Sequence, residues 1–149
     1  MFIGITGSEG LVGRSLWSCL EALGHTPCGI DLRGNNLGRR QRGDVRDPRH
    51  LYHFLEGLDG VIHLAAVSRI LAAEKDPATC WTTNVHGTAC LLTCVAESRP
   101  KPWVVVASSR EVYGLADFVP VAEDTPLRPV NHYGRSKVAR FRENARGGP

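Results

Sequence analysis

The sequence has no long apolar run, no CxxC pair and little net charge. Its longest apolar runs, such as VVVA and LAAV, are far too short to cross a bilayer. The opening residues MFIGITG lack the basic and apolar regions of a secretory signal, so none is expected. A net charge of +3 over 149 residues is too small to indicate nucleic-acid binding. We therefore expect neither a membrane nor a nucleic acid as partner.

The chain has five cysteines, at positions 19, 28, 80, 90 and 94. Their odd number argues against a disulfide framework or a zinc knuckle and favours a reducing, cytoplasmic environment. His86, Cys90 and Cys94 recur every four residues, so one helical face could carry all three. Two interpretations stay open, a metal site or small soft side chains packed on or beside a core face. Because no fourth ligand is in view, we predict no metal.

The chain alternates short apolar runs with patterns of helical spacing. With 42% apolar and 22% charged residues, it has the composition of one globular domain. The predicted strands cover residues 1–6, 26–31, 43–45, 60–67 and 103–109. The predicted helices cover residues 11–23, 48–58 and 77–98, and a last one starts near 132. This order predicts an α/β fold with a doubly wound parallel sheet of about five strands and helices on both faces.

Three glycines, Gly7, Gly10 and Gly13, stand three residues apart between the first predicted strand and the first predicted helix. In a dinucleotide-binding turn, one glycine tolerates positive φ, a second lets a pyrophosphate approach, and a third lets helix and strand pack. The helix N-terminus would add free N–H groups that attract the anion. The same spacing also fits a plain tight turn, so the glycines alone do not decide.

Asp31 closes the second predicted strand, about 20 residues after the glycines, where an acid binds a ribose 2′-hydroxyl. A carboxylate there repels a 2′-phosphate, so the sequence favours NAD over NADP. Arg33, two residues later, weakens this preference. Asp44 could reach the adenine from the neighbouring loop.

The stretch RGNNLGRRQRGDVR concentrates positive charge between residues 33 and 46. It holds no aromatic residue on which a base could stack. Two interpretations stay open, a solvated loop or a patch that attracts a phosphate-rich ligand.

Tyr133 and Lys137 stand four residues apart, and therefore on one face of the last predicted helix. A lysine charge in that position favours the phenolate, which lets a tyrosine act as a general acid or base. Ser108 and Ser109 follow the fifth predicted strand, and ligands bind at the carboxyl ends of such strands. A serine there could hold a substrate oxygen, or it could simply cap or turn the chain.

Seven motifs together carry a specific resemblance: TGSEGLVG, GID, GDVRD, HLAA, TNVHGT, SSREVYG and YGRSK. In this order they resemble the extended short-chain dehydrogenase/reductase family, in its NAD-dependent epimerase/dehydratase group, and they cover nearly the whole chain. The resemblance implies an NAD-binding Rossmann domain over residues 1–149 and oxidoreductase or isomerase chemistry on a nucleotide-sugar substrate.

The resemblance also implies roles for individual residues. Ser109 would be the catalytic serine, Tyr133 the acid/base, and Lys137 the residue that holds the nicotinamide ribose and tunes Tyr133. The cofactor-binding residues would be Gly7, Gly10, Leu11, Val12, Gly13, Asp31, Arg33, Asp44, Val45, Leu64, Ala65, Ala66, Asn84, Tyr133 and Lys137. The segment VSRILAAEKDP is expected to be a loop that faces the substrate.

The sequence departs from the family after YGRSK, because members of the family continue into further strands and a substrate-binding lobe. We therefore expect a truncated Rossmann domain, and an alternative reading is an NAD-binding fragment or split-enzyme subunit without turnover of its own. The fifth predicted strand would then lie near a sheet edge, where a homodimer or a complementary subunit is expected to cover it.

Overall fold

The computed structural model describes residues 1–115 and 119–145, with side chains up to Ala139. The chain divides into two compact units. The first comprises Met1–Ala65 and Cys90–Ala107, and the second comprises Ala66–Ala89 and the chain from Ser108 onward. Each unit is described by itself.

The first unit holds a parallel sheet of five strands in the order β3-β2-β1-β4-β5. The strands are β1 (Phe2–Thr6), β2 (Thr26–Asp31), β3 (Arg40–Arg42), β4 (Gly60–His63) and β5 (Trp103–Val106). In the register of the sheet, Thr6 pairs with Ile30 of β2 and with His63 of β4. The carboxyl ends of the three central strands therefore lie level with one another, as the predicted doubly wound fold requires.

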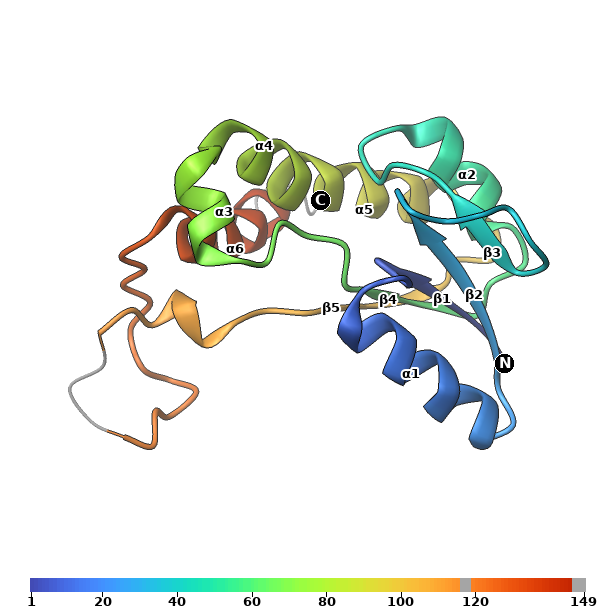
Figure 1. The fold of residues 1–149 in the computed structure, drawn as a ribbon, viewed down its shortest axis with the longest axis horizontal. Helices are drawn as coiled ribbons and strands as arrows, with labels where there is room; N and C mark the ends of the chain where they lie inside the picture. Colours follow the sequence, from blue (N-terminus) through green and yellow to red (C-terminus); the bar gives the residue numbers. More distant parts are fainter. Residues whose placement is uncertain (116–118, 146–149) are drawn as a thin grey trace. The chain divides into compact units, whose positions relative to one another are not determined.

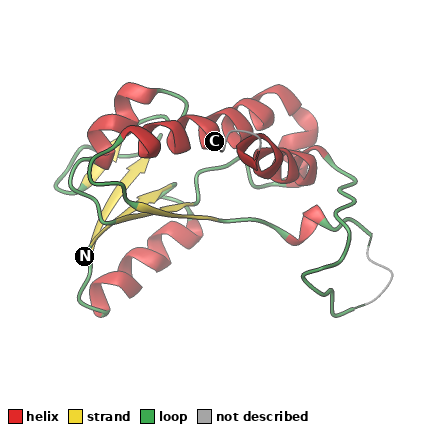
Figure 2. Cartoon of the chain, turned by 180° about the vertical axis from the view of Figure 1, so that it is seen from behind, coloured by secondary structure: helices red, strands yellow, loops and turns green. Residues whose placement is uncertain are grey.

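Helices cover both faces of this sheet (Figure 1). Helix α1 (Leu11–Ala22) packs Trp17 and Leu20 against Ile3 and Ile5 of β1. On the opposite face, α2 (Pro48–Leu55) and the first-unit part of α5 (Gly87–Glu97) enclose the larger core cluster. Figure 2 shows the strands from behind, between these helices. The prediction of helices on both faces is confirmed.

Local sequence signals define the ends of these helices. The Asp47 side chain accepts a hydrogen bond from the backbone N–H of Arg49, and Pro48 occupies the first turn of α2. Helix α1 ends at Ala22, and Gly24 follows with φ of +75°, a left-handed conformation that glycine adopts without a steric penalty.

The second unit is helical. It contains α3 (Ile70–Lys75), α4 (Pro77–Trp81), the π-helical segment η1 (Thr82–His86), the short 3₁₀ helix η2 (Arg110–Val112) and α6 (His132–Ala145). Ala73, Cys80 and Tyr133 form its small buried apolar cluster, with Val67 packed against it. In the described part of the chain, no helix is long and apolar enough to cross a membrane.

Three predicted strands differ from the observed ones. The third strand is Arg40–Arg42 rather than residues 43–45, because Arg40 pairs with Gly29 and Arg42 with Asp31. Gly43 still donates its N–H to the Asp31 carbonyl, but the chain then leaves the sheet. The fourth and fifth strands end at His63 and Val106, four and three residues earlier than predicted from 60–67 and 103–109. The apolar run LAAV continues beyond the last ladder pair of β4, whereas Ala107 and two serines follow that of β5. The sequence alone therefore does not show where the pairing of either strand ends.

The helix predicted over residues 77–98 is also interrupted. Its middle forms η1, where the backbone hydrogen-bond ring widens by one residue. The segment VSRILAAEKDP, predicted as a loop, contains helix α3. Asp76 separates α3 from α4 and caps α4 by accepting from Thr79 N, a signal that the sequence carried but that the prediction did not use.

Candidate functional site

The glycine turn between β1 and α1 requires glycine at two positions. Gly7 has φ of +72°, and a Cβ there would lie 2.8 Å from the backbone nitrogen of Ala65. A Cβ on Gly13 would lie 2.4 Å from the Gly7 carbonyl oxygen, so only glycine lets α1 approach the turn this closely. The Gly10 backbone N–H donates to the Gly7 carbonyl over 3.0 Å and closes the turn.

The N-terminus of α1 follows this turn directly. Gly10 is its N-cap, and among the described side chains none provides a capping hydrogen bond. Leu11 and Val12, which begin the helix, are 87% and 62% exposed. The first-turn N–H groups and the positive end of the helix dipole form an arrangement that suits an anion such as a diphosphate.

Asp31 lies beside the glycine turn at the end of β2. One carboxylate oxygen accepts the backbone N–H of Glu9 over 3.1 Å, and the other accepts that of Arg33 over 2.9 Å. The guanidinium Nε of Arg33 lies 3.5 Å from the same carboxylate. The structure thus brings Asp31, with Arg33 beside it, to the glycine turn, although about 20 residues of sequence separate Asp31 from that turn.

The side chains of Asp44 and Val45 lie in different environments, the first in an ion pair and the second in the core. The Asp44 carboxylate pairs with Arg46, with Nη2 and Oδ2 2.6 Å apart, and the hydrogen bonds from the Arg46 side chain hold the pKa of Asp44 below its usual value. Val45 is buried in the larger core cluster with Leu51. Both residues follow the end of β3 at Arg42, and the adenine contact stays a prediction.

Leu64 and Ala65 of the HLAA motif are fixed by a buried polar group on β1. The Thr6 hydroxyl oxygen accepts the backbone N–H groups of Leu64 and Ala65 over 3.2 and 3.1 Å. It also lies 2.7 Å from Nδ1 of the buried His63 ring. Sequence reasoning missed Thr6 and His63, although Thr6 ends the first strand and His63 opens the HLAA motif. Ala66 begins the second unit.

Asn84 lies in η1 and is almost fully buried. Its side-chain oxygen accepts Val67 N–H over 2.8 Å, and its side-chain nitrogen donates to Val67 O over 3.1 Å. The same nitrogen donates to the Ser136 hydroxyl over 2.9 Å, and that hydroxyl donates to the Tyr133 carbonyl over 2.7 Å. Asn84 therefore joins the chain around Val67 to helix α6.

Tyr133 and Lys137 lie one turn apart on α6, as their spacing predicts. Their side chains are buried, with 8% and 4% of each residue exposed. The Lys137 Nζ lies 5.5 Å from the centroid of the Tyr133 ring. A lysine cation therefore lies beside the ring of the buried tyrosine.

The Ser109 segment is tied to the same helix. Ser109 caps η2 by accepting Glu111 N–H over 3.3 Å, which is the capping role that the sequence left open. The Asn131 side chain donates to the Glu111 carboxylate over 2.7 Å and accepts Gly134 N–H over 2.7 Å. A Cβ on Gly134 would lie 2.5 Å from the Glu111 carbonyl oxygen, so η2 packs directly on the start of α6. Sequence reasoning missed Glu111 and Asn131.

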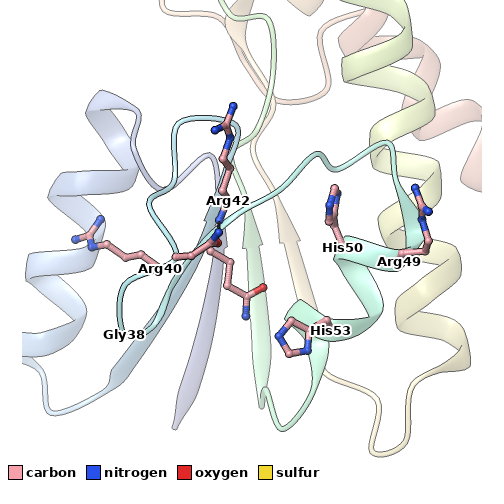
Figure 3. Close-up of a pocket in the computed structure, with 8 residues that line it drawn as sticks. Gly38, Arg40, Arg42, Arg49, His50 and His53 are labelled. Carbon is pink, nitrogen blue, oxygen red and sulfur yellow. Dashed lines mark hydrogen bonds between the residues drawn. The ribbon is translucent and has the colours of Figure 1, made fainter.

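A hollow of about 470 Å³ opens elsewhere on the first unit, between the loop before β3 and α2 (Figure 3). None of the predicted site residues lines it. Its lining is basic and polar: Asn36, Gly38, Arg40, Gln41, Arg42, Arg49, His50 and His53. Most arginines of the 33–46 stretch pair instead with carboxylates, namely Arg33 with Asp31, Arg39 with Glu21, Arg40 with Glu9 and Arg46 with Asp44.

Of the three residues His86, Cys90 and Cys94, the two cysteines pack at the core and His86 is exposed. Cys94 is buried in the larger core cluster, and Cys90 packs against it. Burial raises the pKa of the Cys90 thiol to about 11. In the described chain, no group of three His, Cys, Asp or Glu side chains lies close enough to hold a metal.

The sheet order, the glycine turn and the acid that ends β2 define a Rossmann-type dinucleotide-binding fold. The chain belongs to the NAD-dependent epimerase/dehydratase family, whose sequence model matches residues 3–144.

The relatives of the chain agree with this assignment. It is 37% identical over 147 residues to the UDP-glucose 4-epimerase of Streptomyces lividans, a match that covers 91% of this chain and 44% of that protein. The solved UDP-glucose 4-epimerase of Brucella ovis, in complex with NAD, superposes with a TM-score of 0.89 at 28% identity, covering 97% of this chain and 47% of that one. The solved structure of MoeE5 in complex with UDP-glucose and NAD gives a TM-score of 0.86 at 32% identity, covering 95% of this chain and 47% of that one. The chain thus spans about half the length of these proteins.

Proposed function

We propose that the chain binds NAD through its first unit and carries the acid/base residues of a nucleotide-sugar epimerase or dehydratase in its second. The observation that carries the proposal is the hydrogen bond from Glu9 N–H to Asp31, which joins the glycine turn to the acid at the end of β2. NAD-bound solved structures of the same fold, at 28% and 32% identity, support it.

The residues of the first unit fit this cofactor. Gly7 and Gly13 leave backbone space that a Cβ would fill, and the α1 N-terminus presents N–H groups to a diphosphate. The Asp31 carboxylate suits a ribose diol and opposes a 2′-phosphate, so NAD is the expected form and NADP the less favoured one.

The residues of the second unit suit proton transfer at a substrate hydroxyl. Tyr133, as phenolate, would take the hydroxyl proton, and Lys137 would stabilise that phenolate through its positive charge. When bound, NAD supplies the acceptor for the hydride that leaves the carbon bearing that hydroxyl. Ser109 would hold the substrate oxygen by a hydrogen bond. The UDP-sugar bound to MoeE5 supports a nucleotide-sugar as the substrate class.

A second candidate function is NAD binding without turnover. The observation that favours it is length, because the matches cover 44% to 47% of the relatives. Binding energy from remote parts of a substrate normally supports the chemical step. A complementary subunit or a second copy of the chain would then supply the remaining surface and cover β5.

Calorimetric titration of the chain with NAD, followed by NADH absorbance measurements with UDP-glucose, separates the two candidates. Binding with turnover supports an enzyme, and binding without turnover supports the module. Tyr133→Phe should abolish turnover and keep NAD affinity, whereas Tyr113→Phe, the matched control, should change neither. Absence of NAD binding in the wild-type chain would overturn both candidates, and full activity in Tyr133→Phe would overturn the acid/base assignment.

A further inference from the structure

Glu9 occupies a position in the glycine turn that the motif leaves free. Its backbone N–H donates to the Asp31 carboxylate over 3.1 Å, so the residue adjoins the group proposed to bind the ribose. Its own side chain is 15% exposed, which is a low value for a glutamate in a surface turn.

Two arginines hold the Glu9 carboxylate. Oε1 lies 2.5 Å from Nη1 of Arg40, and Oε2 lies 3.2 Å from Nη2 of Arg14. The Arg40 guanidinium also lies 3.9 Å from the centroid of the Trp17 ring. Figure 3 shows Arg40 extending from β3 toward α1, away from Arg42 and His50. Arg40 therefore contacts Glu9 and Trp17, although it also lines the basic hollow.

The ion pairs of Glu9 and Asp31 are nearly balanced in charge. Three arginines, Arg14, Arg33 and Arg40, face the two carboxylates of Glu9 and Asp31, which leaves a net charge of 3 − 2 = +1. Without the Glu9 charge the same group would carry 3 − 1 = +2. Guanidinium groups bind phosphates in two-pronged geometry, and a phosphate monoester carries about −1.5 to −2 charges at neutral pH.

We propose that Glu9 is a second specificity-determining residue, beside Asp31, which selects NAD over NADP by occupying Arg14 and Arg40. The inference rests on the proposed binding of NAD. The Glu9 carboxylate neutralises two guanidinium groups that a 2′-phosphate would need, and it adds a negative charge next to that of Asp31. Arg33, which alone would favour the phosphate, remains engaged with Asp31.

The test measures the dissociation constants of NAD and NADP by calorimetry for the wild-type chain and for Glu9→Gln. Glutamine keeps the shape of the side chain and removes its charge. We expect NADP to bind roughly tenfold more tightly to Glu9→Gln than to the wild type, which is the scale of one charge-assisted hydrogen bond. NAD affinity should stay within about twofold, because NAD lacks the 2′-phosphate.

Glu21→Gln is the matched control, because Glu21 pairs with Arg39 at 3.5 Å on the same helix as Arg14. This variant should leave the ratio of the NAD and NADP dissociation constants unchanged. Arg14→Gln, at a guanidinium that is 68% exposed, should shift the ratio in the opposite direction, toward NAD. This second variant keeps the test decisive if Glu9→Gln does not fold.

Three outcomes overturn the inference: an unchanged ratio in folded Glu9→Gln, an equal shift in Glu21→Gln, or a shift toward NADP in Arg14→Gln. A wild-type chain that binds neither dinucleotide would overturn the proposed function, and this inference with it. A wild-type chain that binds NAD while any of the three outcomes occurs would overturn the inference and leave the proposed function intact.

Discussion

The side-chain nitrogen of Asn84 donates to the hydroxyl of Ser136 over 2.9 Å, and both residues are at most 1% exposed. Ser136 stands between Tyr133 and Lys137 on α6, and Asn84 lies in the π-helical segment η1. The proposed acid/base pair is therefore positioned from the buried side of its helix, by a contact between residues 52 positions apart.

Replacing Asn84 should destabilise the second unit more than an exposed asparagine would. Asn84→Ala leaves the Val67 N–H, the Val67 carbonyl and the Ser136 hydroxyl without these hydrogen bonds, which should lower the free energy of unfolding by roughly 3 kcal/mol. Asn35→Ala, which removes a single exposed hydrogen bond of 3.3 Å, should cost less than about 0.5 kcal/mol. Urea unfolding measures both, and equal losses would contradict the importance of the network.

Gly7 should tolerate alanine less well than Gly24 does. Both have positive φ, of +72° and +75°, so each substitution should cost about 1 kcal/mol in backbone strain. At Gly7 the new Cβ would also meet the Ala65 nitrogen at 2.8 Å, whereas at Gly24 no described atom lies within 4 Å. We therefore expect Gly7→Ala to be more destabilising and to weaken NAD binding. Matched unfolding curves and calorimetry check this, and indistinguishable curves would show that the close approach matters little.

The carboxyl group of Asp47, which caps α2, should titrate at an unusually low pH. The hydrogen bond from the Arg49 side chain lowers its pKa from 3.8 to about 2. Because the folded-state pKa is depressed, the associated stability is present above the unfolded value and is lost as the pH falls through the folded one. The window therefore runs from about pH 4 down to about pH 2.

Carboxyl titration by NMR, in the wild type and in Arg49→Gln, checks this shift. The pKa of Asp47 should rise toward 3.8 in the variant but stay below it, since the Arg49 backbone N–H still donates. Asp76, which caps α4 and whose pKa is lowered by hydrogen bonds from Thr79, should keep the same pKa in both proteins. An Asp47 pKa that stays at about 2 in Arg49→Gln would contradict the assigned cause.

Strand β5 should make the chain associate. In the described part of the chain β5 pairs with β4 alone, and Trp103 and Val105 are 41% and 54% exposed. Such an edge offers unpaired backbone groups to another chain. Light scattering at micromolar concentration should show dimers or larger species, and Val105→Lys should reduce them. Leu71→Lys, at an exposed apolar residue on α3, serves as the control, and a monodisperse wild-type monomer would contradict the expectation.

The elements of the first unit followed from local patterns. Apolar runs and helical spacing predicted β1, β2 and α1 to within one residue of their observed bounds, because these signals depend on neighbouring residues. The second helix was predicted to end at residue 58 and ends at Leu55. The glycine series and Asp31 predicted the dinucleotide turn for the same reason: strand, turn and acid occur in a fixed order along the chain.

The wrong predictions concern elements whose bounds depend on contacts between residues that are distant in the sequence. Whether residues 40–42 or 43–45 form the third strand depends on register with β2, which is a contact between distant segments. The π-helical segment η1 contains the buried Asn84, whose side chain bonds Val67 and Ser136, both distant in the sequence. Helical periodicity carries no sign of such a local widening.

The sequence by itself determined the alternation of strands and helices, the glycines that admit a close backbone approach, and the spacing of Tyr133 and Lys137, since each depends on residues that are near one another in the chain. The tertiary structure determined which charged side chains form ion pairs. Glu9 reaches Arg40 across 31 positions, because strand order brings β3 to β2 and α1 to the same edge. Ion pairs of this kind have no periodicity along the chain, so they emerge only when the sheet is assembled.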